Sequence, residues 1–92
     1  MSDEKKELQI IIKEMIILFE GSGLNSWVET YSNMLQVLED EVDYVKYQLA
    51  ISFGGMGSIN DLVLYRKGVL LITENNQLDE LRQKLYILVT RR

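Results

Sequence analysis

Apolar side chains recur every three to four residues in four separate segments of this chain, and this spacing constrains its fold more than any other feature. Such spacing places the apolar side chains on one face of an α-helix, where they can be buried against other helices. The four predicted helices cover residues 4–20, 27–38, 40–53 and 77–90. The sequence therefore predicts a mainly α protein, a small four-helix domain that spans residues 1–92.

Residues typical of helix boundaries mark the ends of the predicted helices. The turn Gly21-Ser22-Gly23 ends the first helix, and Asn25 or Ser26 is expected to cap the second. Asn75-Asn76 precedes the fourth helix. The residues expected to face the core are Leu8, Ile11, Ile12, Met15, Ile16, Phe19, Trp27, Val28, Tyr31, Met34, Leu35, Leu38, Val42, Val45, Leu49, Phe53, Leu78, Leu81, Leu85, Leu88 and Val89.

Residues 62–72 do not follow the helical pattern and are open to two interpretations. Residues 62–65 and 69–72 are short apolar runs on either side of Arg66-Lys67-Gly68, which predicts a short β-hairpin between the third and fourth helices. Ser58 and Asp61 stand at the spacing of a helix capping box, so a helical turn can also begin here and lead into a strand. The sequence leaves open whether residues 62–72 are a hairpin or helical.

Composition sets the size of the core and the expected compartment. With 92 residues, of which 47% are hydrophobic, the chain can bury a core without disulfides. It has no cysteine, which suits a reducing cytosol. The apolar run at residues 10–19 is interrupted by Lys13 and Glu14, so it resembles neither a signal peptide nor a membrane span. We therefore expect a cytoplasmic protein that does not enter a membrane.

The charge balance favours some partners over others. Fourteen acidic residues against ten basic ones give a net charge of −4, and no stripe of lysine or arginine is present. An acidic surface repels the phosphate backbone, so direct binding to nucleic acid is disfavoured. A basic protein would be attracted instead, because complementary charge speeds association.

The lack of histidine and cysteine removes most catalytic chemistry. Without them the chain can form no Ser–His or Cys–His nucleophile pair and no metal site built on imidazole or thiolate. Carboxylates remain, but their spacing matches no EF-hand calcium loop. We therefore predict that the protein is not an enzyme and uses no cofactor or metal ion.

The glycine-rich segment beginning at residue 54 is the most specific local pattern in the chain. Its notable residues are Gly54, Gly55, Gly57, Ser58, Asn60 and Asp61. One interpretation is a phosphate cradle, which would make the protein a small-ligand or nucleotide-responsive module. However, the segment lacks the Gly-Lys-Ser/Thr ending of a phosphate-binding loop, and Asp61 would repel an anion. We favour the other interpretation, a tight structural connection.

Two predicted helices carry apolar or aromatic residues opposite their core faces. In the third helix these outer residues are Asp40, Tyr44, Tyr47 and Ile51. Tyrosines beside acids are typical of protein interfaces, whereas the alternative is a second layer of core. In the first helix Ile10 and Ile17 take the same position, and for these two we favour burial in a second layer over self-association.

The string Gly54-Gly55-Met56-Gly57-Ser58-Ile59-Asn60-Asp61-Leu62, with Glu74-Asn75-Asn76 downstream, resembles the Gly-Gly-Met-Gly-Ser-x-Asn-Asp-Leu motif of a family of small bacterial proteins. The likeness extends over about residues 53–86. Some members of that family resemble the immunity proteins of contact-dependent inhibition and related polymorphic toxin systems. The resemblance implies a protein that binds a cognate toxin, often a nuclease, and neutralises it inside the producing cell.

The same resemblance indicates where the toxin would be bound. Immunity proteins vary most where they touch their toxins, so the shared motif would belong to the scaffold and the contact face would lie elsewhere. The expected contact residues are Glu39, Asp40, Glu41, Asp43, Tyr44 and Tyr47. An acidic face of this kind suits a basic ribonuclease domain.

Overall fold

The structure is a computed structural model that describes residues 2–54 and 58–90. Its elements are α1 (Ser2–Gly21), α2 (Asn25–Val37), α3 (Val42–Ile51), the 3₁₀ turn η1 (Ile59–Asp61), β1 (Tyr65–Arg66), β2 (Val69–Leu70) and α4 (Ile72–Thr90). The predicted fold class is confirmed, because the chain is mainly helical, with four helices and a two-stranded antiparallel hairpin between α3 and α4.

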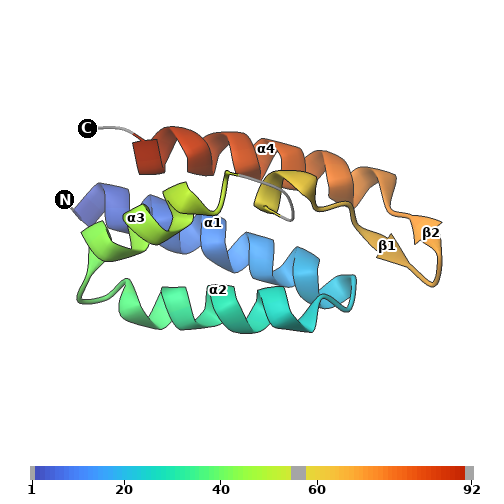
Figure 1. Ribbon diagram of the computed structural model, residues 1–92, viewed down its shortest axis with the longest axis horizontal. Coiled ribbons are helices and arrows are strands. Elements are labelled where there is room, and N and C mark those ends of the chain that lie inside the picture. Colours follow the sequence, from blue (N-terminus) through green and yellow to red (C-terminus); the bar gives the residue numbers. More distant parts are fainter. Residues whose placement is uncertain (1, 55–57, 91–92) are drawn as a thin grey trace.

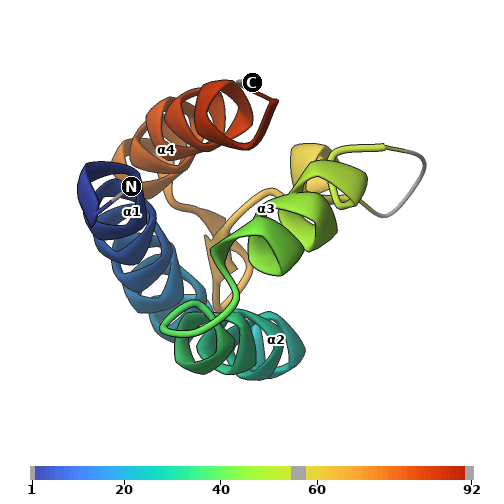
Figure 2. The same cartoon turned by 90° about the vertical axis from the view of Figure 1, so that its left-hand side faces the viewer.

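The helices form an elongated bundle of 40 × 22 × 21 Å (Figure 1). Helix α1 packs against α2 on one side and α4 on the other, and α3 packs against α4 and α2, so that the four helices surround one core (Figure 2). The hairpin lies at one end of the bundle, and the turn between α2 and α3 lies at the opposite end (Figure 1). The molecule therefore has two ends, built from different parts of the chain.

The core confirms the periodicity read from the sequence. Its buried members in the helices, with Leu38 directly after α2, are Leu8, Ile11, Ile12, Met15, Phe19, Tyr31, Leu38, Val45, Leu49, Leu78, Leu81, Leu85, Leu88 and Val89. Ile59 and Leu64, which lie outside the helices, are also fully buried. These two side chains fix the glycine-rich segment and the base of the hairpin to the helical core.

The turn between α1 and α2 differs from the prediction that Asn25 or Ser26 caps the second helix. Helix α2 begins at Asn25 itself, the N-cap position belongs to Leu24, and no side chain caps the helix. Gly23 adopts φ +71°, and the Leu24 N–H reaches back to the Phe19 carbonyl at 3.0 Å. This is the Schellman arrangement, in which backbone bonds close the end of one helix while the apolar Leu24 packs against the core.

The hairpin is shorter than the two four-residue runs suggested. Only Tyr65–Arg66 and Val69–Leu70 pair, and the central turn residues Lys67 and Gly68 both have positive φ, of 52° and 79°. That conformation matches the twist of antiparallel strands and suits a two-residue turn. The last residue of the second predicted run, Ile72, instead begins α4.

Helix α4 begins five residues before the predicted start at residue 77, so Asn75 and Asn76 lie inside it. The Asn75 side chain explains the difference. It accepts a hydrogen bond from the Leu64 N–H at 2.8 Å and donates to the Leu64 and Leu71 carbonyls at 3.0 and 2.7 Å. Asn75 therefore pairs with the neighbouring extended chain as another strand would, and it does not end a helix.

Helix α3 is shorter at both ends than the predicted span of residues 40–53. Asp40 lies in the turn before it, where the N–H groups of Asp40 and Glu41 both donate to the Val37 carbonyl. At the other end the Ser52 hydroxyl donates to the Leu49 carbonyl at 2.6 Å, and this competition with the backbone favours the end of a helix. Phe53 therefore follows the helix and is half-buried.

The expected burial of Ile10 and Ile17 is wrong. Their side chains are 58% and 65% exposed, because α1 meets α2 and α4 through its other sides and no described element covers this one (Figure 2). Despite these isoleucines, no helix in the described part of the chain has the length and apolar character needed to cross a membrane.

Candidate functional site

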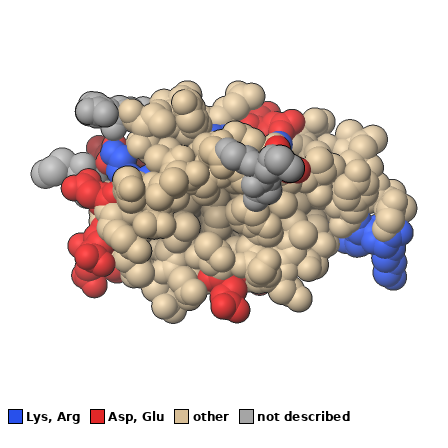
Figure 3. Space-filling view, in the orientation of Figure 1, with Lys and Arg blue, Asp and Glu red and all other residues tan. Residues whose placement is uncertain are grey.

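The predicted contact residues lie together at the end of the bundle where α2 turns into α3. We call them the acid–tyrosine surface, and its members are Glu39, Asp40, Glu41, Asp43, Tyr44 and Tyr47. All six are exposed. Acidic side chains gather at the left-hand end of the molecule in Figure 3, beside a broad area without charged residues. All six therefore lie exposed in the turn between α2 and α3 or in the first two turns of α3, where Tyr44 and Tyr47 are on the outer side of the helix.

One member of the acid–tyrosine surface is tied to the rest of the molecule. Lys5 of α1 donates to the Glu39 backbone carbonyl at 3.0 Å, and its ammonium group lies 3.3 Å from the Glu39 carboxylate. The Gln9 amide also donates to that carboxylate, at 3.0 Å. These contacts attach the turn to α1, so Glu39 has a structural role in addition to its exposed charge.

The other five members are free of such ties. Within the described part of the chain, the side chains of Asp40, Glu41, Asp43, Tyr44 and Tyr47 make no hydrogen bond or ion pair. Tyr44 and Tyr47 are 54% and 65% exposed. Since nothing in the fold requires these groups at these positions, they are available to a partner.

A shallow groove adjoins this surface between α2 and α3. It has a volume of about 250 Å³, and its walls include Met34 and Val37 from α2 and Tyr44 and Val45 from α3. Tyr44 therefore belongs both to the acidic end and to the edge of an apolar groove. A groove of this size can accept one or two side chains of a partner.

The glycine-rich segment is held by side-chain contacts in its described part. Ser58 is buried and its hydroxyl accepts a hydrogen bond from the Asn60 N–H at 3.3 Å, so Ser58 caps η1. The Asn60 amide donates to the Phe53 carbonyl at 3.0 Å, and the Ile59 N–H donates to the Ser52 carbonyl at 3.0 Å. These bonds join the two ends of the loop, as expected of a structural connection.

The remaining described residues of the motif make fewer contacts with the rest of the fold. Gly54 is exposed and its N–H donates to the Ile51 carbonyl at 3.1 Å, while Asp61 is exposed at the end of η1. Gly55 and Gly57 lie outside the described residues. The helical turn predicted from the capping-box spacing is present as η1, and it leads through an extended segment into β1.

Arg82 of α4 completes the attachment of this segment, and the sequence did not single it out. One guanidinium nitrogen donates to the carbonyls of Ile59, Asn60 and Leu62 at 2.9, 3.3 and 3.1 Å, and another is paired with Asp79. Those carbonyls belong to η1 and the residue after it, where few backbone partners are available. The spacing of Asp79 and Arg82 on one helix face was the only signal for this role.

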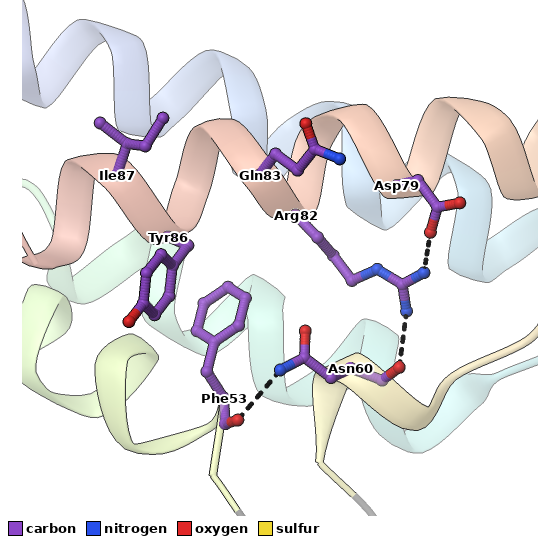
Figure 4. Close-up of a pocket in the computed structure, with 7 residues that line it drawn as sticks. All are labelled: Phe53, Asn60, Asp79, Arg82, Gln83, Tyr86 and Ile87. Atoms are coloured by element: carbon purple, nitrogen blue, oxygen red, sulfur yellow. Dashed lines mark hydrogen bonds and ion pairs between the residues drawn. The ribbon is translucent and has the colours of Figure 1, made fainter.

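A hollow of about 540 Å³ lies beside Arg82 (Figure 4). Its lining residues are Phe53, Asn60, Asp79, Arg82, Gln83, Tyr86 and Ile87. The Phe53 and Tyr86 rings meet edge to face, with centroids 5.3 Å apart. Because Arg82 is already engaged by the three carbonyls and by Asp79, the hollow offers no free guanidinium to a phosphate.

Tyr31 is the one polar side chain without a partner in the described core. Its hydroxyl is fully buried and makes no hydrogen bond. Burial raises the pKa of Tyr31 from 10.0 to about 12, and the nearby Ser52 hydroxyl offsets only part of that rise. The Ser52 hydroxyl donates to the Leu49 carbonyl, and no hydrogen bond joins its oxygen to the Tyr31 hydroxyl. Tyr31 therefore packs as an aromatic side chain against Phe19 and Trp27.

The described residues contain no group of three or more acidic side chains placed to hold a metal ion. The fold and these sites define a small helical domain whose glycine-rich segment belongs to its framework. Residues 20–72, more than half of the chain, match the family described as Domain of unknown function (DUF6966), and the chain belongs to that family. No curated protein and no solved structure matches the chain.

Proposed function

We propose that this protein is a non-catalytic immunity protein, which binds a basic toxin domain in the cytoplasm through the acid–tyrosine surface and thereby blocks the toxin. The exposed position of Tyr44 and Tyr47 beside four acids is the observation that carries the proposal. The resemblance of the glycine-rich motif to immunity proteins agrees with it. A nuclease domain is the favoured target, because an enzyme that binds nucleic acid presents a basic active site.

The charges of the surface support a basic partner. Asp40, Glu41 and Asp43 lie close together in sequence without internal ion pairs among the described residues, so their negative charge is not offset locally. Such a group accelerates encounter with a positively charged protein and repels other acidic proteins. It would compete with nucleic acid for the same basic cleft.

The tyrosines support a protein partner over a free ion. A tyrosine ring supplies a large contact area with little loss of side-chain freedom, and tyrosine is enriched among the residues that dominate binding energy. Tyr44 also borders the groove between α2 and α3, into which a partner side chain can fit. Acidic residues around an aromatic centre would then provide the polar rim of the interface.

Binding to the polypeptide encoded directly upstream tests the proposal. Co-expression of this protein should rescue cells from the toxic domain of that polypeptide, and the purified pair should form a complex that weakens as NaCl is raised. Asp40→Lys and Tyr44→Ala should each weaken the complex at least about tenfold, because the first sets a positive charge against the basic partner and the second removes the aromatic centre of the contact. Isothermal titration calorimetry measures the dissociation constants of both variants and their dependence on NaCl.

Matched controls lie at the other end of the molecule. Tyr65→Ala removes a tyrosine of similar exposure, 51%, from the hairpin, and Glu29→Lys reverses an exposed acid early in α2. Both should bind as the unmodified protein does. If the controls lost as much affinity for the toxin domain as the surface variants do, this surface would be rejected as the binding site. If co-expression did not rescue the cells, the immunity role would be rejected.

The hollow beside Arg82 favours one second candidate, a small-ligand module that uses the loop of residues 54–61. Its volume of about 540 Å³ falls in the range of small-molecule sites, roughly 300–1,000 Å³. A thermal-shift screen with nucleosides and nucleotides tests this candidate. Stabilisation that Gln83→Ala and Tyr86→Ala abolish would support it, and the absence of any stabilising compound would reject it.

A further inference from the structure

The β-hairpin holds the densest group of exposed apolar side chains in the described part of the chain. Twelve large apolar or aromatic residues are exposed there, and five of them fall within residues 63–72. These five are Val63, Tyr65, Val69, Leu70 and Ile72, with exposed fractions between 47% and 67%. Exposed apolar residues that are scattered singly need no explanation, but a group on one short segment indicates a contact surface.

Two of these side chains form an uncovered face of the hairpin. Tyr65 pairs with Leu70 across the strands, so their side chains lie next to each other. One residue further towards the bundle, the Leu71 N–H donates to the Leu64 carbonyl at 3.1 Å, and there Leu64 is buried in the core and Leu71 packs against it. Because side chains alternate along a strand, Tyr65 and Leu70 point away from the core. We call the side of the hairpin that they form its outer face.

The charges of this segment are all positive. Residues 62–73 contain Arg66 and Lys67 and none of the fourteen acidic residues of the chain. Arg66 donates to the Gly21 carbonyl at 2.8 Å, which ties the hairpin to the end of α1. The Lys67 side chain makes no hydrogen bond, and neither cation forms an ion pair, among the described residues. In Figure 3 basic side chains project from the right-hand end of the molecule, where Figure 1 places the hairpin.

The turn of the hairpin does not itself call for Lys67. The φ of this residue, 52°, lies in the left-handed region, which asparagine and glycine adopt more easily than lysine does. Lysine therefore costs stability here relative to asparagine, and it places a free ammonium group at the tip of the hairpin. Backbone strain that the fold does not need indicates a function for the side chain.

We propose that the hairpin binds the surface of an anionic lipid bilayer, with its outer face among the lipid headgroups and Lys67 beside their phosphates. Tyrosine rings favour the boundary between headgroups and acyl chains, and a lysine beside an apolar surface can reach a negative charge. Each cation near an anionic bilayer adds to the attraction. The expectation that the protein does not enter a membrane rested on the interrupted apolar run at residues 10–19, and a hairpin at the bilayer surface needs no such run.

The size and shape of the hairpin favour a bilayer over a protein partner. A stable protein interface uses about 20–30 residues on each side. The hairpin offers only two residues in each strand and a two-residue turn, and it projects from one end of the bundle (Figure 1). Lipids can rearrange around a small convex surface, whereas a folded protein would need a matching groove.

The negative charge of the whole chain lies mostly away from this tip. The bundle is 40 Å long, and the acid–tyrosine surface is at the end opposite the hairpin (Figure 1). Physiological salt screens exposed charges beyond about 8 Å. Glu20 of α1 and Glu74 of α4 are nearer, but in Figure 1 the turn between β1 and β2 extends past the ends of both helices. A bilayer at the tip would therefore meet Lys67 first.

Cosedimentation of the whole chain with lipid vesicles tests the proposal. The protein should bind vesicles made of equal parts phosphatidylcholine and phosphatidylglycerol, which we call the mixed vesicles. It should bind vesicles of phosphatidylcholine alone at least about fivefold more weakly, because the attraction of the cations to anionic lipid is lost. NaCl should weaken binding to the mixed vesicles. Absence of binding to the mixed vesicles would overturn the proposal.

A charge reversal at the tip tests the role of Lys67. Lys67→Glu should weaken binding to the mixed vesicles at least about tenfold, because it changes the charge beside the phosphates by two units. Lys13→Glu is the matched control, since it makes the same change at an exposed lysine of α1 without a side-chain partner in the described structure. Both variants have a net charge of −6, from −4 minus two units, so overall charge cannot distinguish them. Equal losses from the two variants would contradict the proposed contact.

Lys67→Asn separates lipid binding from the stability of the turn. Asparagine suits the positive φ of this position, so the variant should melt at the same temperature as the unmodified protein or higher. It should nevertheless bind the mixed vesicles about fivefold more weakly, because one positive charge is lost. Circular dichroism during heating and cosedimentation measure the two quantities. Unchanged binding to the mixed vesicles would show that lipid does not recognise Lys67.

A polarity-sensitive dye on a single cysteine tests the outer face, and the chain has no native cysteine to interfere. The labelled Leu70→Cys protein should become brighter when the mixed vesicles are added, because its dye moves into a less polar environment. The labelled Ile17→Cys protein is the control, since residue 17 is 65% exposed on α1, and its fluorescence should not change. A constant signal from the Leu70→Cys protein would reject the outer face, and brightening of the Ile17→Cys protein alone would place the contact on α1.

The inference does not depend on the proposed immunity function, because the hairpin and the acid–tyrosine surface lie at opposite ends of the bundle (Figure 1). Asp40→Lys should bind the mixed vesicles no less tightly than the unmodified protein, and Lys67→Glu should still bind the toxin domain. Failure of either function would therefore be observed with different variants. If the protein bound no vesicles but sedimented as a dimer that Leu70→Asp dissociates, a second copy would cover the hairpin and the proposal of a bilayer would be wrong.

Discussion

Two regions of this molecule hold its most conspicuous residues, and they use them in opposite ways. The loop junction is the name we give to five residues whose side chains bond to the backbone of the glycine-rich segment or of the chain on either side of it: Ser52, Ser58, Asn60, Asn75 and Arg82. Their side chains bond to the backbone, as Asn75 does to Leu64 and Leu71. On the acid–tyrosine surface, by contrast, only Glu39 has side-chain partners among the described residues.

This difference indicates which residues stabilise the fold and which are free to bind a partner. A polar side chain whose donors and acceptors are satisfied inside the fold contributes to stability, since breaking those bonds leaves backbone groups unpaired. An exposed polar or aromatic side chain with no internal bond contributes little to stability. Its contribution is to the free energy of binding a partner. Variants in the two regions should therefore have opposite effects on stability and binding.

The largest effect on stability should come from Asn75→Leu, which preserves much of the volume and removes three hydrogen bonds. The Leu64 N–H loses its side-chain partner, as do two carbonyls, so the free energy of unfolding should fall by about 2–4 kcal/mol. In a chain of this size the melting temperature would drop by more than about 10 °C. Circular dichroism during heating and urea titration measures both quantities.

The adjacent residue provides the control for this change. Asn76 is exposed, its side chain has no bond among the described residues, and Asn76→Leu should shift the free energy of unfolding by no more than about 0.5 kcal/mol. Similar losses from both substitutions would mean that helix propensity, and not the bond to Leu64, sets the effect. The loop junction would then differ less from the surface than its contacts imply.

Tyr31→Phe should have an effect that depends on pH, because Tyr31 packs beside the loop junction at Ser52. The folded pKa of about 12 exceeds the unfolded value of 10.0, so the folded state holds this proton more tightly. The stability contribution is complete below pH 10 and is lost as the pH rises towards 12, by about 3 kcal/mol in all. Tyr31→Phe should lack that loss, and at neutral pH it should be as stable or slightly more stable.

Denaturant titrations at pH 8, 10 and 11.5 measure how the free energy of unfolding falls with pH. Tyr44→Phe is the matched control, because it removes a hydroxyl from an exposed tyrosine and should retain the alkaline loss of stability seen in the unmodified protein. If the free energy of unfolding fell equally with pH in both variants, the Tyr31 hydroxyl would have a hydrogen-bond partner or water in solution. The interior beside Ser52 would then be less closed than its burial indicates.

The sequence predicted those features that depend on side-chain periodicity and failed where single side chains decide the outcome. The apolar spacing gave four helices and nearly all of the core, because burial of a continuous face is a property of many residues. The start of α4 was missed because an asparagine before an apolar run resembles a helix boundary, whereas Asn75 bonds across to Leu64. That contact joins residues eleven positions apart, and no local pattern reveals it.

The candidate site shows the same limit. Helical spacing was enough to place Tyr44 and Tyr47 together on the outer side of α3, although Asp40 lies in the preceding turn. The expectation that Ile10 and Ile17 are buried was wrong, since helical spacing identifies an outer side without showing whether a neighbour covers it. Arg82 was missed altogether, because three carbonyls from another segment define its role.

The smallest effects on stability should come from the acid–tyrosine surface, and they are the most direct test of the comparison. Asp40→Lys and Tyr44→Ala break no internal bond in the described structure, so each should change the melting temperature by less than about 3 °C. The same two variants should lose toxin binding, whereas Asn75→Leu, studied below its own melting temperature, should bind within about twofold of the unmodified protein, because its surface is unchanged. Binding calorimetry and thermal unfolding of all three proteins under one set of conditions would show whether the loss of binding and the loss of stability fall on different variants. Unfolding caused by Tyr44→Ala would place that tyrosine in the core, and weak binding by folded Asn75→Leu would place the toxin contact at the loop junction.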